Sequence, residues 1–249
     1  PGHAVSATCT TEGTTPCADG LLTMEAENDG DVVSYSFVAA NPGTYTYHSG
    51  TNPGLQVEMG LTGVLIVRPA SDPGNRAYNH VETEYTYEHL FFLSEMDPRI
   101  HTEVALNGPD TPLVQELLDN YFSNYWFING RTAPDNFSEA FVPWLPTQPY
   151  NSVPRMHPGD KLLMRVVGGG SDLHPFHHHG NHARIIARDG RLLSSGPGAG
   201  PGPGPRGGGR GPHKQNPFIP QQQRIRAFHR RPPVLIRRPA LRSRRGQYR

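Results

Sequence analysis

Residues 161–180 read KLLMRVVGGGSDLHPFHHHG, and this stretch decides how the rest of the chain is interpreted. Its first residues are mostly apolar and lead into three glycines, which indicates a short strand followed by a turn. Similar apolar runs bounded by Gly or Pro recur at residues 60–69 (GLTGVLIVRP) and 182–190 (HARIIARDG). The chain is therefore expected to contain a series of short strands joined by turns.

Other segments extend this pattern toward the N-terminus. GDVVSYSFVAA at residues 30–40 alternates apolar and polar side chains, and Asn41–Gly43 then turns the chain into TYTYHSG. YEHLFFLSEM (87–96) and YFSNYWFING (121–130) also indicate strands. Only residues 111–122 fit a period of 3.6 residues better than a period of 2, which predicts one short helix. The whole pattern predicts an all-β fold of Greek-key β-sandwiches.

Charge is distributed unevenly along the 249 residues. Residues 1–195 contain 10 Lys and Arg and all 22 Asp and Glu, a net charge of −12, and the other 13 basic residues follow them. Residues 196–249 are rich in Gly, Pro and Arg, so we expect a disordered tail there. A basic tail can bind nucleic acid through phosphates. The abrupt change at Gly196 instead favours a frameshifted or non-native segment, which argues against a nucleic-acid partner.

The acidic part of the chain is predicted to contain two domains. Residues 1–70 form a partial domain, residues 71–80 a linker, and residues 81–195 a second, incomplete domain that carries the histidine run. No apolar run reaches the length of about 18 residues that a membrane-spanning helix needs, so we expect no membrane span.

Cysteine usage points to an oxidising compartment. Cys9 and Cys17 lie close together in a Thr- and Gly-rich stretch and fit a small disulfide loop better than a pair of metal-binding thiols. We therefore expect a periplasmic or secreted protein. No signal peptide is visible, and because the chain starts at Pro1 rather than Met, we expect its N-terminus to be incomplete.

Histidines crowd into the end of the opening stretch. His174, His177, His178 and His179 occupy six positions, and His182 follows. Imidazole is the commonest transition-metal ligand in proteins. In an extended segment, His177 and His179 point to one face and His178 to the opposite face. The pattern favours a metal site, and an incidental cluster in an exposed loop is the alternative.

The run HPFHHHG at residues 174–180 matches H-P-x-H-x-H-G, the third copper motif of the multicopper oxidases, and the chain resembles this family, which includes the laccases. PGTYTYHSG (42–50) and LQVEMGLTGVLIVRP (55–69) resemble the region of the family's second motif, and PGDKLLMRVVGGGSDL (158–173) resembles the approach to the third. The resemblance covers about residues 1–195. It implies cupredoxin-like sandwich domains with copper as the cofactor.

The resemblance also implies roles for four histidines. His174 would ligate the mononuclear blue copper, which accepts electrons from a small-molecule reducing substrate. His177 would ligate the type 2 copper of the trinuclear cluster, and His179 one of its type 3 coppers, where dioxygen is reduced. His48 would be a further type 3 ligand. His178 fills a variable position and is expected to face solvent or to lie beside the site.

The chain departs from the family pattern in three places. Gly50 stands where the second motif ends in histidine, and Val5 stands where the first motif, H-W-H-G, would supply a ligand. The fourth motif, whose H-C-H supplies the blue-copper thiolate, is absent, and neither Cys9 nor Cys17 is flanked by histidine. We therefore expect a multicopper oxidase truncated or frameshifted before its last motif, whose activity as a separate chain is in doubt. The alternative is a non-catalytic cupredoxin-like copper-binding protein.

Overall fold

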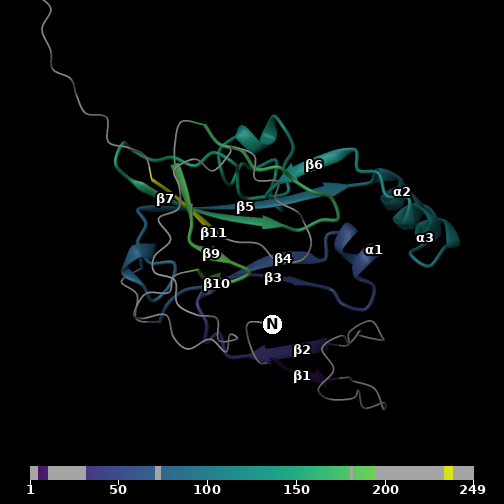
Figure 1. The fold of residues 1–249 in the computed structure, drawn as a ribbon. Helices are drawn as coiled ribbons and strands as arrows, with labels where there is room; N and C mark the ends of the chain where they lie inside the picture. The colour runs from purple at the N-terminus through teal and green to yellow at the C-terminus, as the bar shows by residue number, and fades with distance from the viewer. Residues whose placement is uncertain (1–4, 11–31, 71–73, 180–181, 194–232, 238–249) are drawn as a thin grey trace, which may run out of the picture.

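The computed structural model describes residues 5–10, 32–70, 74–179, 182–193 and 233–237. Two antiparallel hairpins come from the first part of the chain (Figure 1). Strand β1 (Val5–Thr10) pairs with β2 (Val32–Phe37), and β3 (Gly43–His48) pairs with β4 (Thr62–Val67). The connection between β3 and β4 contains the short helix α1 (Pro53–Glu58), which begins after Asn52 accepts a hydrogen bond from the Leu55 N–H.

The largest sheet has five strands in the order β6-β5-β7-β11-β8. Its members are β5 (Tyr87–Met96), β6 (Tyr125–Ile128), β7 (Lys161–Gly168), β8 (His182–Ile185) and β11 (Pro233–Arg237). Strands β5 and β7 run parallel, whereas β6 is antiparallel to β5, and β11 is antiparallel to both β7 and β8. Strand β7 is thus paired along both edges.

Two helices follow β5 and extend from one end of this sheet (Figure 1). Helix α2 (Pro98–Asn107) is capped by Asp97, and α3 (Pro112–Asp119) is capped by Thr111. Single 3₁₀ turns occupy Val81–Thr83 and Asp135–Phe137, and a small hairpin joins β9 (Ala187–Arg188) to β10 (Arg191–Leu192). No helix in the described part of the chain is long and apolar enough to cross a membrane.

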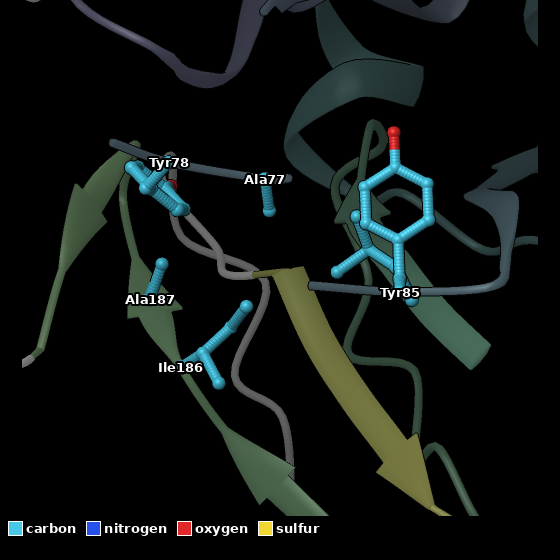
Figure 2. Packing of buried hydrophobic residues seen from close by; sticks show 6 residues of the cluster. Ala77, Tyr78, Tyr85, Ile186 and Ala187 are labelled. Carbon is cyan, nitrogen blue, oxygen red and sulfur yellow. The ribbon is translucent and has the colours of Figure 1, made fainter. Parts of the chain in front are cut away.

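Strand β7 explains how the core is divided. Its side chains alternate between two faces, and both faces are covered, which is why its sequence is almost continuously apolar. One face packs with β5 in a cluster of Phe91, Leu93, Leu162, Met164 and Val166. Leu163, on the other face, packs in a second cluster with Ala77, Tyr78, Tyr85, Ile186 and Ala187, which Figure 2 labels.

A buried arginine links the β3–β4 hairpin to the large sheet. The Arg165 Nη1 atom on β7 donates to Thr44 Oγ1 on β3 at 2.7 Å, and its Nε atom donates to Glu88 on β5. The Arg68 guanidinium, just after β4, donates to the other oxygen of Glu88. The division at residues 71–80 stays a prediction, and within that range Ala77 and Tyr78 are buried in the core cluster of Figure 2.

Strands predominate in the described residues, which confirms the β-rich prediction. The predicted helix is confirmed as α3, and α1 and α2 were not predicted. The expectation of disorder in residues 196–249 stays a prediction, and within that range the structure describes Pro233–Arg237, which form β11. The central PVLIR sequence favours a strand, and pairing with β7 and β8 satisfies its backbone groups on both sides. The other tail residues lie outside the described part.

Candidate metal centre

The histidine run follows β7 and lies outside regular secondary structure, but its side chains alternate like those of an extended segment. His174, Phe176 and His178 are half-buried, whereas His177 and His179 are exposed. Phe176 anchors the segment, because its ring packs edge-on against Phe91 on β5 with centroids 5.2 Å apart. The local backbone therefore presents His177 and His179 on one face, as the sequence predicts.

His177 and His179 meet at their ring nitrogens. Their Nε2 atoms lie 3.1 Å apart, and the two rings are nearly perpendicular, with centroids 4.5 Å apart. Two imidazoles bound to one ion with bonds of about 2.0–2.1 Å have their nitrogens about 3 Å apart. At this separation the two rings share a hydrogen bond, so one of the two Nε2 atoms carries its proton. Once that proton is lost, both nitrogens can face one metal centre, and the donor set suits copper, zinc, iron or nickel.

His178 points to the opposite side of the segment. It lines a cleft of about 600 Å³, and its buried Nδ1 atom has no hydrogen-bond partner among the described residues. Burial lowers the pKa of His178, and the neighbouring charges of His177, His179 and His182 lower it further. The cleft is mainly apolar and is lined by Phe91, Ile128, Asn136, Phe137, Ser152, Pro154, Arg155, Met156, Leu162, Met164, Phe176, His177 and His178.

His174 has a different environment from the pair. Its Nε2 atom lies 2.5 Å from Oε2 of Glu95, at the end of β5, and the Glu95 side chain is completely buried. No motif in the sequence indicates a role for Glu95. A signal was present nonetheless, because Glu95 occupies the same strand face as the apolar residues Phe91 and Leu93. An acid in that position requires a polar partner.

His48 lies at the end of β3 and is exposed, with its Nδ1 atom 2.7 Å from the carbonyl oxygen of Ser49. Within the described ranges, no group of three or more His, Cys, Asp or Glu side chains is placed to hold a metal ion. The structure thus brings His177 and His179 together, whereas His48, predicted for the same cluster, and His174, predicted for the mononuclear copper, do not form such a group with them among the described residues. Val5 and Cys9 lie in β1, and Cys17 lies outside the described residues, so the disulfide stays a prediction.

Comparison with solved structures identifies the fold. The chain matches the blue copper oxidase from Nitrosomonas europaea with a TM-score of 0.53 and 17% identity, covering 96% of this chain and 60% of that one. It matches the multicopper oxidase mgLAC with a TM-score of 0.56 and 18% identity, covering 95% of this chain and 60% of that one. The chain has a multicopper oxidase-like fold.

This likeness confirms, at the level of fold, the family resemblance that the histidine motif indicates. The chain spans about 60% of the length of these two multicopper oxidases. No family model matches the sequence, and no curated protein matches it. The assignment of individual ligands therefore depends on the motif and on the geometry around it.

Proposed function

We propose that this chain is a copper-binding oxidoreductase of the multicopper oxidase type that carries part of the copper-ligand set. The observation that carries the proposal is the convergence of His177 and His179, whose Nε2 atoms are 3.1 Å apart within an H-P-x-H-x-H-G motif. The multicopper oxidase-like fold supports it. In this proposal the β-rich chain consists of cupredoxin-like Greek-key sandwich domains.

The chain's own residues have distinct tasks. His177 and His179 would hold copper of the oxygen-reducing cluster with their Nε2 atoms, and His48 would add a further ligand. His174 would hold the substrate-oxidising copper. Copper, when bound, supplies one-electron transfer from a small-molecule reductant toward dioxygen. Phe176 fixes the ligand segment through its contact with Phe91, so that the two exposed imidazoles stay on one face.

The activity of the whole protein is part of the proposal, because the chain spans about 60% of the two oxidases it resembles. The chain lacks the histidine-flanked cysteine of a blue copper site. A complete electron path therefore needs ligands from outside this sequence. An oxidising compartment, periplasmic or extracellular, agrees with Cys9 and Cys17 as a disulfide pair.

A non-catalytic copper-binding protein is the second candidate, and Gly50 favours it. This residue stands two positions after His48, where the family's second motif has histidine, and it has no side chain to bind metal. A lost ligand at that place weakens the oxygen-reducing cluster but leaves the His177–His179 pair intact. Copper binding without turnover is its expected behaviour.

Copper titration of the full chain tests the first step of both candidates. H177A and H179A are expected to lower Cu(II) affinity at least about tenfold and to remove nitrogen couplings from the copper EPR spectrum. H157A is the matched control, since the His157 side chain is 82% exposed and lies outside the motif. Equal copper uptake by wild type and H177A would refute copper binding at this pair.

Oxygen consumption separates the two candidates. The copper-loaded chain is incubated with a phenolic reductant, and dioxygen uptake is followed with an electrode. Uptake that depends on His177 and His179 supports the oxidoreductase. Copper binding without uptake supports the non-catalytic protein.

A further inference from the structure

Glu95 lies among apolar residues on the buried face of β5, where an acidic side chain is stable only if it has polar partners. Phe91, Leu93 and Glu95 alternate along β5 and are all buried, so the carboxyl group lies on the core face of the strand. Burying a charged group without partners is costly. The partners of Glu95 therefore show what the residue does.

Both carboxyl oxygens of Glu95 are occupied from the loop after β7. The Asp172 backbone N–H donates to Oε1 at 2.6 Å, and the His174 Nε2 atom lies 2.5 Å from Oε2. Asp172 is itself held, because the Ser123 hydroxyl donates to its carboxylate. The loop is thus fixed on both sides of Leu173, and His174 has one ring nitrogen committed to Glu95.

Two glycines that follow β7 pass close to side chains of β5, and one of them, Gly170, lies against the Glu95 carboxyl group. A Cβ atom on Gly170 would lie 2.2 Å from Glu95 Oε1, and a Cβ atom on Gly169 would lie 2.1 Å from the ring of Phe92. Contacts this short require the neighbour to move, so a side chain at position 170 would displace the Glu95 carboxyl group and one at position 169 would displace the Phe92 ring. Gly169 and Gly170, directly after β7, therefore allow the loop to pass close to β5 beside the buried acid.

We propose that Glu95 is a positioning residue that accepts a hydrogen bond from the Nε2–H of His174 and so fixes the ring with Nδ1 as its free lone pair. A carboxylate oxygen can only accept, so the proton of this bond belongs to Nε2. The neutral ring then offers Nδ1, and only Nδ1, to a metal ion. Carboxylates that hold a metal-binding histidine in this way fix its tautomer and orientation.

The inference rests on the proposed function in one respect, namely that His174 is a copper ligand. The hydrogen bond and the tautomer are properties of the protein itself and are measured without metal. The two ideas can therefore fail separately.

Nitrogen-15 NMR of histidine-labelled, metal-free protein reports the tautomer of each ring, and H174Q assigns the His174 signals. The wild type is expected to show a protonated Nε2 and an unprotonated Nδ1 at His174. A wild-type ring protonated at Nδ1 alone would overturn the proposal without any need for a variant.

E95Q provides the sharper comparison, because Gln has one acceptor oxygen where Glu95 uses two. If the Gln amide oxygen keeps the hydrogen bond from the Asp172 N–H, the amide NH₂ group faces His174 Nε2. Nε2 must then accept a hydrogen bond, so the ring proton moves to Nδ1. E95M, of similar length but without an acceptor, is expected to remove the tautomer preference. His174 signals identical to those of the wild type in both folded variants would contradict the proposal.

Copper titration then tests whether His174 is a copper ligand, which is the part of the inference that rests on the proposed function. H174A is expected to remove one copper site. E95Q is expected to lower the copper affinity of that same site by about 10–100-fold. If H174A leaves copper binding unchanged while E95Q reverses the tautomer, His174 is not a ligand, and that part of the proposed function fails. The positioning of His174 by Glu95 would stand in that case.

Discussion

Arg165 links the β3–β4 hairpin to the large sheet. Its side chain is completely buried, and it donates to Glu88 and to Thr44. A buried charge of this kind is tolerated only because its partner neutralises it. Glu88 in turn accepts from Arg68, so three charged side chains form one network between β4, β5 and β7.

Arg165→Met is expected to lower the free energy of unfolding by about 3 kcal/mol, because it leaves the Glu88 carboxylate partly buried with only Arg68 to pair with it. Urea denaturation followed by fluorescence measures this loss. Arg155→Met is the matched control, since Arg155 and Glu139 are paired at the surface with side chains 75% and 70% exposed. The control is expected to cost less than about 1 kcal/mol. Equal losses in the two variants would contradict this account of Arg165.

The histidines differ in how far the sequence predicts their surroundings. His177 and His179 lie together because side chains two positions apart in an extended segment point to the same face, so the local sequence is enough to predict their contact. The contact of His174 with Glu95 joins residues 79 positions apart, and it depends on the parallel pairing of β5 with β7. No local pattern contains that information. An acid within an apolar alternation was the only signal available.

At the scale of elements, Asp97 joins β5, α2 and the segment that follows α3. It caps α2 by accepting from the Arg99 N–H at 3.0 Å, and its other oxygen accepts from the Phe122 N–H at 3.0 Å. The Arg99 guanidinium also donates to the carboxylate, and its Nη2 atom donates to the Asn120 carbonyl oxygen. The hydrogen bond from Arg99 is the main reason that the pKa of Asp97 lies below its ordinary value.

Asp97→Asn is expected to destabilise the protein at neutral pH by about 2 kcal/mol, because Asn keeps the cap but loses the charged pairing with Arg99. The pKa of Asp97 is lower in the folded state than in the unfolded chain. Its contribution is therefore complete above the ordinary Asp pKa and is lost as pH falls through the lowered value. Denaturation measured at a series of acidic pH values should show a smaller difference between wild type and D97N at each step downward. A constant difference would contradict the ion pair as its source.

Helices were harder to predict than strands, for reasons visible in their burial. Helix α3 was found because Val114, Leu117 and Leu118 form an apolar stripe against α2. Helix α2 buries only Ile100 completely, and the six-residue α1 buries only Leu55, so neither has enough apolar positions to show a period. Both start at a proline preceded by a capping residue, which was the sequence signal for them.

Strand β11 supplies a prediction about backbone pairing. Leu235 lies opposite Leu163 of β7 and opposite Arg184 of β8, so its N–H belongs to one of two ladders. Leu235→Pro removes that donor and places a proline ring in a central strand. Hydrogen exchange should accelerate in residues 161–165 and 182–185, whereas Leu235→Val, which keeps the N–H, should match the wild type. Unchanged exchange in L235P would mean that these residues do not pair in solution.

At the scale of the whole molecule, nearly the whole chain aligns with an oxidase fold, whereas the sequence contains only part of the family's copper-ligand pattern. The chain aligns over 96% of its length with a blue copper oxidase, yet it spans 60% of that protein. The strand pattern was predictable because each strand carries its own alternation or apolar run. The arrangement of the sheets was not, because the pairing of β5 with β7 crosses a long connection containing α2, α3 and β6.

The cysteine content of the whole chain leads to a spectroscopic prediction. A blue copper site takes two histidines and a cysteine thiolate, and this chain has two cysteines, Cys9 and Cys17, neither of them beside a histidine. The copper-loaded chain is therefore expected to lack the intense visible absorption of thiolate-to-copper charge transfer, even where His174 binds copper. Absorption spectra of wild type and C9S/C17S should be the same after copper loading. An intense band in the wild type that disappears in C9S/C17S would mean that one of these cysteines reaches the copper, and the disulfide expected between them would then be excluded.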